Sequence, residues 1–221
     1  MSDVDDVGVY CWPRFPALPN CGRPVVLRVA VPTARADARR TLRAALRHVL
    51  AAWSGLPPEE LPLDETPRGP VWKGLLHGAT LDISLSHARG AGCQPASAQT
   101  VHQPACDQAG WQPAPRTEGW IGLLRGGQIG VDVTAAEPFA ELDGVAESFL
   151  DPTVAADIRT AADPAMAFAA AWTEREARLK CLKRGLIEWN ADDAQAEAEC
   201  VCRRLILCER LVGAVCWRSG S

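Results

Sequence analysis

Residues 172–180 read WTEREARLK, a short charged stretch that begins with a tryptophan. In a helix, side chains four residues apart lie on one face, so Trp172, Glu176 and Lys180 form a stripe with Lys183 close to it. The carboxylate and the ammonium of this stripe are either a solvated ion pair, worth about 0.2–0.5 kcal/mol, or two groups directed at one ligand. Spacing alone favours the solvated pair, so the rest of the chain has to decide between them.

A second unusual carboxylate lies about 40 residues upstream. The sequence WIGLLR (120–125), a Gly-Gly pair and QIGVDVT (128–134) together predict a β-hairpin. Asp132 falls inside the second strand between two valines, although aspartate is poor strand material. An unpaired carboxylate on a buried face would cost several kcal/mol, so Asp132 is expected to have a cation beside it.

Composition narrows the class of protein. The chain has 221 residues, of which 23% are charged and 48% hydrophobic, and its formal net charge is −4. These values are typical of one large globular domain or two small lobes. No basic surplus suggests nucleic acid, and no apolar run of about 18 residues suggests a membrane span. We expect a cytoplasmic protein with neither nucleic acid nor a membrane as a partner.

The nine cysteines form no CxxC pair, and their odd number does not suit a small disulfide scaffold. Three of them, Cys200, Cys202 and Cys208, lie in CVCRRLILC (200–208), which predicts a strand with all three on one face. We interpret them as small buried hydrophobic residues, with a metal site as the minor alternative.

The first half of the chain predicts a strand at 25–31 and a helix at 35–53. One side of this helix is basic, which indicates either a solvated face or an anion site. The Pro-rich segment 56–70 predicts a loop, and the alternation in LDISLSH (81–87) predicts a half-buried strand. The arginines of the basic side are Arg35, Arg39, Arg40, Arg43 and Arg47.

Residues 91–118 differ in composition, because 15 of these 28 residues are Ala, Gln or Pro. They predict a flexible surface insertion, in which His102 and Cys106 are incidental. Helices are predicted at 140–150, 151–163 and 165–185, the last capped by Gly185, and a hairpin at 200–208 and 211–217. Each half thus has a helix and antiparallel strands, although a duplication is not established.

Two of these stretches together resemble the Sfp-type 4'-phosphopantetheinyl transferases. That family carries G-[IV]-D and then W-[ST]-x-K-E-[AS]-x-x-K, to which IGVDVT (129–134) and FAAAWTEREARLK (168–180) are similar. Arg175 stands where the family has Lys. Ser86–His87 resembles the family's S-H, TPRGPVW (66–72) resembles its G-K-P loop, and the helix from Arg35 resembles its first helix.

The resemblance implies an α+β, pseudo-twofold fold of two similar lobes, each with a helix packed on a mainly antiparallel sheet. We assign residues 1–118 to the N-terminal lobe, insertion included, and 119–221 to the lobe with the metal-binding motif. Coenzyme A and Mg²⁺ would lie between the lobes. The implied reaction moves the phosphopantetheine arm of coenzyme A onto a serine of an acyl or peptidyl carrier protein and releases 3',5'-ADP. A monomer is expected.

The resemblance also implies roles for single residues. Asp132 and Glu176 would bind Mg²⁺, and Glu176, directly or through a water, is the candidate base for the carrier serine. Lys180 would contact the pyrophosphate and stabilise or protonate the leaving 3',5'-ADP, so these three residues are the catalytic set. Trp172 would pack and lock the helix. The residues expected to bind coenzyme A besides these are Arg35, Arg39 or Arg40, Arg68, Ser86 and His87.

Three features depart from the family pattern: two single positions and the insertion at 91–118, for which gating the site, selecting a carrier and no role at all are left open. Thr134 stands where many members have a third carboxylate, so more water on the metal or help from Glu137 is expected. Gly69 replaces the loop lysine, so a phosphate contact is expected to shift to Arg68. The alternatives are a catalytically degenerate protein that binds coenzyme A or a carrier, and a cysteine-rich metal or redox protein. The expected carrier surface is the helix around Lys180 to Leu186 together with the loop that follows it.

Overall fold

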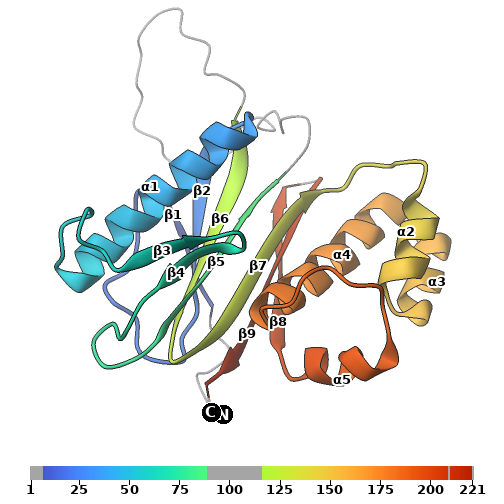
Figure 1. Ribbon diagram of the computed structural model, residues 1–221. Helices are drawn as coiled ribbons and strands as arrows, with labels where there is room; N and C mark the ends of the chain where they lie inside the picture. The colour runs from blue at the N-terminus through green and yellow to red at the C-terminus, as the bar shows by residue number, and fades with distance from the viewer. Residues whose placement is uncertain (1–6, 89–115, 209, 221) are drawn as a thin grey trace, which may run out of the picture.

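The structure is a computed structural model that describes residues 7–88, 116–208 and 210–220. It is a mixed α+β fold in which the helices and strands form two unequal halves (Figure 1). The predicted insertion at 91–118, with His102 and Cys106, lies outside the described residues except for its last three positions, which begin β6. The described helices are α1 (Arg35–Ser54), α2 (Leu142–Phe149), α3 (Pro152–Thr160), α4 (Pro164–Cys181) and α5 (Ala191–Ala198).

The first half is built on a four-stranded sheet whose spatial order is β1-β2-β6-β5. Helix α1 lies across one face of it (Figure 1), because its apolar stripe, from Leu42 to Trp53, is buried against β2 and β6. The predicted strand at 25–31 and the predicted helix at 35–53 are both confirmed. The strands are β1 (Gly8–Cys11), β2 (Val25–Pro32), β6 (Arg116–Arg125) and β5 (Leu81–His87).

The segment 56–70 is not entirely loop, as its prolines suggested. Its second part contains β3 (Leu63–Thr66) and the start of β4 (Gly69–Trp72), which form a separate two-stranded hairpin. Pro70 is tolerated because a two-stranded sheet leaves one side of each strand without a ladder. The tight turn of this hairpin holds Arg68.

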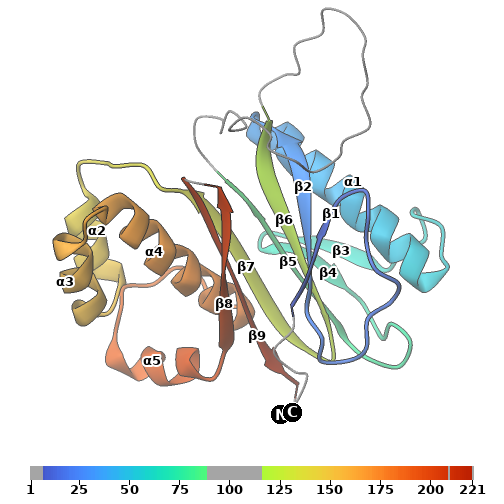
Figure 2. The ribbon, with the colours of Figure 1, turned by 180° about the vertical axis from the view of Figure 1, so that it is seen from behind.

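The second half is built on the sheet β7-β9-β8, which α4 covers on one face (Figure 2). Helices α2 and α3 pack beside α4 around their own apolar cluster. The hairpin predicted for 200–208 and 211–217 is confirmed as β8 and β9, which pair antiparallel. These strands are β7 (Gly127–Ala135), β8 (Val201–Cys208) and β9 (Leu211–Ser219).

The hairpin predicted for 120–134 is wrong. Both strands exist, but β6 pairs with β2 and β5, whereas β7 pairs with β9 in the other sheet. Gly126, with φ +70°, makes the corner between them. A Gly-Gly pair between two strands therefore marks here the passage from one sheet to the next, and β6, which ends at Arg125, belongs to the first sheet.

Side chains of β5 join the two sheets. Asp82, Ser84 and Ser86 accept hydrogen bonds from the N–H groups of Ile129, Val131 and Val133, over 2.7, 3.0 and 3.2 Å. Strands β5 and β7 thus run side by side in both views (Figures 1 and 2) without a main-chain ladder between them. The polar face of LDISLSH is directed at the other half of the protein, and both serines are buried. We call this contact the β5–β7 seam.

Helix α4 ends earlier than predicted, at Cys181 rather than near Gly185. Lys183 takes the left-handed conformation, with φ +58°, that a glycine usually takes after a helix. The Lys183 ammonium lies 2.6 Å from Asp82 of the seam, and Arg68 donates to the Lys183 carbonyl oxygen over 2.6 Å. These two contacts stabilise a helix end that lacks glycine.

The cysteines are only partly as expected. Cys200 is buried and lies in one apolar cluster with Cys181, but Cys202 forms a disulfide with Cys216, its cross-strand partner. The side chain of Cys208 lies outside the described residues. In the part of the chain that the structure describes, no helix is long and apolar enough to cross a membrane.

Candidate active site

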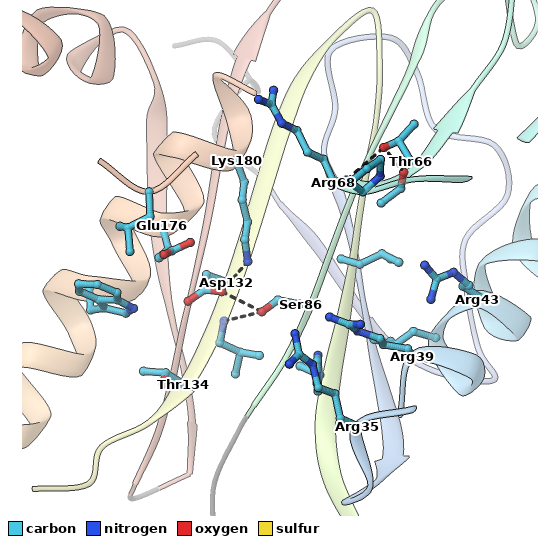
Figure 3. Close-up of a pocket in the computed structure, with 18 residues that line it drawn as sticks. Arg35, Arg39, Arg43, Thr66, Arg68, Ser86, Asp132, Thr134, Glu176 and Lys180 are labelled. Atoms are coloured by element: carbon cyan, nitrogen blue, oxygen red, sulfur yellow. Dashed lines mark hydrogen bonds and ion pairs between the residues drawn. The ribbon is translucent and has the colours of Figure 1, made fainter. Parts of the chain in front are cut away.

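A cleft of about 740 Å³ separates α1 and the β3–β4 hairpin from β7 and α4 (Figure 3). This volume lies within the range of small-molecule sites. Both halves of the protein supply its walls, and the β5–β7 seam is its floor. The lining residues are Arg35, Arg39, Leu42, Arg43, Thr66, Pro67, Arg68, Gly69, Leu85, Ser86, His87, Asp132, Val133, Thr134, Trp172, Glu176, Lys180 and Leu186.

The stripe on α4 faces this cleft. Trp172, Glu176 and Lys180 all line it, one helical turn apart. Trp172 also stacks on Phe168, with ring centroids 5.4 Å apart, and meets Phe149 edge-on. The tryptophan therefore fixes the rotation of α4, and the two charged side chains are directed at the cleft rather than at bulk solvent.

Asp132 lies at the floor of the cleft and is only 8% exposed. Its Oδ1 atom accepts a hydrogen bond from Ser86 Oγ over 2.8 Å and lies 2.7 Å from Lys180 Nζ (Figure 3). The cation that the sequence predicted beside this carboxylate is thus Lys180. Strand β5, strand β7 and helix α4 meet at this one oxygen atom.

Glu176 is the second carboxylate of the cleft. Among the described residues, its side chain has no hydrogen-bond or ion-pair partner. Burial, and next the charge of Asp132, raise the pKa of Glu176 above its ordinary value, although Lys180 and Arg175 act the other way. An unpartnered carboxylate held near another one favours a proton or an added cation.

This pair suits a hard divalent cation such as Mg²⁺, which takes one or two carboxylates together with phosphate oxygens and water. The residues present fit that requirement, because Glu176 has no partner among the described residues and its pKa is raised by burial and by the neighbouring carboxylate. Thr134 lines the cleft close by, whereas Glu137 does not. Within the described ranges, no group of three or more His, Cys, Asp or Glu side chains is placed to hold a metal.

Gly130 explains how α4 comes so close to β7. A Cβ atom at this position would lie 1.9 Å from the carbonyl oxygen of Ala177 and 2.5 Å from the amide nitrogen of Cys181. Only a residue without a side chain permits this approach of two backbones. The glycine of the G-V-D triplet therefore sets the distance between Asp132 on the strand and the charged stripe on the helix.

The opposite wall of the cleft is basic. Arg35, Arg39 and Arg43 project from α1 into it, spaced four residues apart (Figure 3). Arg43 is held by both oxygens of Glu65, at 2.9 and 3.0 Å, whereas Arg39 has no hydrogen-bond or ion-pair partner among the described residues. These guanidinium groups suit an anionic ligand such as a phosphate.

Arg40 does not line the cleft. Its side chain is 79% exposed and pairs with Asp37 on the surface of α1. The helical period separates it from Arg39 by about 100°. Among the three arginines that the sequence left open, Arg35 and Arg39 are therefore placed to meet a ligand in the cleft. Arg43 was not singled out as a ligand, although its position four residues after Arg39 was the available signal.

The remaining predicted ligands also reach the cleft. Ser86 and His87 lie at the end of β5, and Arg68 lies in the β3–β4 turn. Arg68 donates a hydrogen bond to the Lys183 carbonyl oxygen and so bridges the mouth of the cleft. Two residues that position the site were missed, Ser84 in the seam and Gly130 under α4. The sequence signals that could have shown them are the alternating polar residues of β5 and the glycine two positions before Asp132.

The part of the chain that forms β7, α4 and most of β9 resembles a known group of proteins. Residues 128–215 match the family model of the 4'-phosphopantetheinyl transferase superfamily. The match includes Asp132, Glu176 and Lys180, and it supports a transferase; members of that superfamily use coenzyme A and act on carrier proteins. No curated protein matches the chain.

Proposed function

We propose that this protein transfers the 4'-phosphopantetheine arm of coenzyme A to a serine of an acyl or peptidyl carrier protein, as Sfp-type transferases do. The observation that carries the proposal is the meeting of Asp132, Glu176 and Lys180 in one cleft, opposite a row of arginines. The superfamily match over 128–215 supports it independently of the geometry.

The basic wall is suited to the nucleotide end of coenzyme A. Arg35 and Arg39 are placed to meet the 3'-phosphate, because an arginine pairs with two phosphate oxygens at once. His87 and Ser86 are placed to contact the phosphates from the floor. Arg68 would have to exchange the Lys183 carbonyl oxygen for a phosphate oxygen.

The chemistry needs in-line placement and neutralisation of charge more than covalent help. The carrier serine oxygen attacks the phosphorus that bears the pantetheine arm, and the bond from that phosphorus to 3',5'-ADP breaks. Glu176 takes the serine proton, directly or through a water, and its raised pKa suits that task. Lys180 stabilises the charge that develops on the departing phosphate.

Asp132 and Glu176 are the residues that would hold Mg²⁺, which when bound would neutralise the pyrophosphate oxygens. Asp132 is oriented for this by Ser86, and its second oxygen is not needed for the contact with Lys180. Thr134 adds a hydroxyl group to the same wall.

The proposal includes the quaternary state and the acceptor side. A monomer suffices, because one chain supplies both walls of the cleft, and a cytoplasmic location stays a prediction from composition.

The carrier would approach over the end of α4, where Leu186 lines the cleft and is 47% exposed. Lys183 is less available for this contact than the sequence suggested, since it pairs with Asp82.

A second candidate is a degenerate relative that binds coenzyme A or a carrier without turnover. It is favoured by one observation: Asp132 and Glu176 are the only carboxylates among the described residues that line the cleft, because Thr134 stands where a third would be. This candidate predicts binding without release of 3',5'-ADP.

Mass spectrometry of an apo carrier protein, incubated with this protein, coenzyme A and Mg²⁺, decides between the two. We expect the carrier to gain one phosphopantetheine arm, and Glu176→Gln to abolish the gain while coenzyme A still binds. Glu174→Gln is the matched control, because Glu174 lies on the same helix but pairs with Arg178 and Arg204. No gain with fatty-acid, polyketide or peptide carriers, with coenzyme A still bound, would refute the transferase.

A further inference from the structure

Residues 182–190, which connect α4 to α5, have no regular secondary structure and border the cleft. We call them the connector. Its position depends on separate anchors: Arg68 donates to the Lys183 carbonyl oxygen, and the Trp189 amide donates to the Ser148 carbonyl oxygen over 2.9 Å. Between these anchors the connector exposes Leu186 and Ile187, which are 47% and 38% exposed.

Arg175 supplies the anchor in the middle of the connector. Its guanidinium group donates to the Ile187 carbonyl oxygen over 3.1 Å and to the carbonyl oxygen of Phe149 at the end of α2. Its third neighbour is the Glu197 carboxylate of α5, at 3.9 Å. One side chain thus joins α4, α2, the connector and α5.

Arg175 is also buried, with 4% of the residue exposed, and it immediately precedes Glu176. Successive helical residues project about 100° apart, so Glu176 points into the cleft while Arg175 points behind it. A buried guanidinium is costly unless its donors are used, and here two of them hold main-chain oxygens. This arrangement is built to hold the connector against the helix that carries the catalytic groups.

We propose that Arg175 is a positioning residue for the acceptor, which fixes the Leu186–Ile187 edge where the carrier protein docks. This inference rests on the proposed function. The basic wall on α1 suits the nucleotide, so the carrier serine has to enter from the α4 side, where the connector forms the rim. Exposed apolar side chains on a fixed rim suit a protein partner better than a solvated pantetheine arm.

Lysine would not replace Arg175 fully. A lysine ammonium is a point charge on a flexible stem, whereas the planar guanidinium reaches two carbonyl oxygens from two elements at once. We expect Arg175→Lys to keep the protein folded and to loosen the connector. Loss of one charged hydrogen bond should raise KM for the carrier about tenfold. The kcat at saturating carrier and the KM for coenzyme A should stay unchanged.

The test compares wild type, Arg175→Lys and Arg175→Met by steady-state transfer kinetics and by hydrogen exchange of the connector. Arg178→Lys is the matched control, because Arg178 lies on the same helix but pairs with Glu174 over 2.7 Å. We expect a higher carrier KM and faster exchange in 182–190 for the Arg175 variants alone, with unchanged exchange in α4. Arg175→Lys keeps the test decisive if Arg175→Met does not fold.

An unchanged carrier KM in Arg175→Lys, with wild-type transfer intact, would overturn the role of Arg175 and leave the proposed function standing. Parallel changes in kcat and in both KM values, or faster exchange throughout α4, would also overturn it, because they indicate a general structural role. A wild-type protein that transfers nothing to any carrier refutes the proposed function, and the acceptor role of Arg175 with it.

Discussion

Lys180 Nζ lies 2.7 Å from Asp132 Oδ1 and 3.2 Å from the Val131 carbonyl oxygen, so one ammonium group connects helix α4 to the central residue of strand β7. The two residues are far apart in the sequence, and each comes from a stretch with an unusual carboxylate, IGVDVT (129–134) or WTEREARLK (172–180). Their contact leaves Glu176, one turn earlier on α4, without a partner of its own among the described residues. The charged centre therefore contains one carboxylate with a hydrogen bond and an ion pair, Asp132, and one with no partner among the described residues, Glu176.

Lys180→Met should therefore remove both a catalytic cation and the partner of a buried carboxylate. We expect kcat for transfer to fall by at least about 100-fold, as expected for losing a group that stabilises developing charge. Lys73→Met is the control, since Lys73 forms a surface pair with Asp64 and does not line the cleft. Steady-state transfer to a carrier measures the effect, and a kcat within a few-fold of wild type would contradict the role of Lys180.

Gly130→Ala tests whether the approach of α4 to β7 sets the site. The added methyl group would collide with the Ala177 carbonyl oxygen and push the helix outward. We expect the free energy of unfolding to fall by about 1–3 kcal/mol or more, and transfer activity to fall with it. Gly144→Ala is the control, because a Cβ there meets nothing within 4 Å. Urea unfolding that is unchanged in Gly130→Ala would refute the close-approach argument.

Much of this site could be predicted because its signals are local. The stripe of Trp172, Glu176 and Lys180 follows from helical pitch, and the cation demanded by Asp132 follows from an isolated charge in an apolar strand. Similarly, the apolar stripe of α1 predicted the helix that carries the basic wall. In each case the pattern is complete within one element, so no knowledge of distant partners was needed.

The predictions that were wrong or incomplete concern contacts between residues that are distant in the sequence. Strand β7 was assigned to the wrong neighbour because a Gly-Gly turn fits a hairpin and a corner between sheets equally well. For β5 the sequence predicted only a half-buried strand, since alternation shows which side is polar but not what covers it. Ser84 and Val131, 47 residues apart, are joined only when both sheets are in place.

Ser84→Ala tests that seam without touching a cleft residue. The substitution would leave the buried Val131 amide without an acceptor, which costs about 1–3 kcal/mol of the free energy of unfolding. Because Val131 precedes Asp132, we also expect transfer activity to fall. Ser148→Ala, on the exposed side of α2, should stay within about 0.5 kcal/mol of wild type in urea unfolding. Equal stability of the two variants would show that the seam contributes nothing.

Arg184→Glu tests the expected carrier surface and leaves in place the ion pair between Lys183 and Asp82, which belongs to the seam. Carriers of this family are acidic around their serine, by resemblance, so a new negative charge at the end of α4 should repel them. We expect a higher KM for the carrier, most clearly at low salt, and unchanged binding of coenzyme A. Arg203→Glu, an exposed residue of β8, is the charge-matched control. An unchanged carrier KM would move the docking surface elsewhere.

Glu176→Gln should make the protein more stable at neutral pH while it abolishes transfer. Burial and Asp132 raise the pKa of Glu176 in the folded state above its ordinary value of 4.5. The folded chain therefore binds this proton more tightly than the unfolded chain does. Its contribution to the free energy of unfolding is present in full below pH 4.5 and is lost as the pH rises through the folded pKa.

Glutamine carries no charge, so the variant escapes that loss, and its Tm should exceed that of wild type at pH 7 and approach it below pH 4.5. Glu174→Gln should not gain stability, because Arg178 and Arg204, against the effect of burial, hold the pKa of Glu174 below its ordinary value. Mg²⁺ should raise the Tm of wild type and have less effect on Glu176→Gln, since only the wild type offers both carboxylates. Thermal unfolding across this pH range measures both effects. A Tm for Glu176→Gln that lies below wild type at pH 7 would mean that Glu176 has a stabilising partner, and the carboxylate pair would no longer suit an added cation.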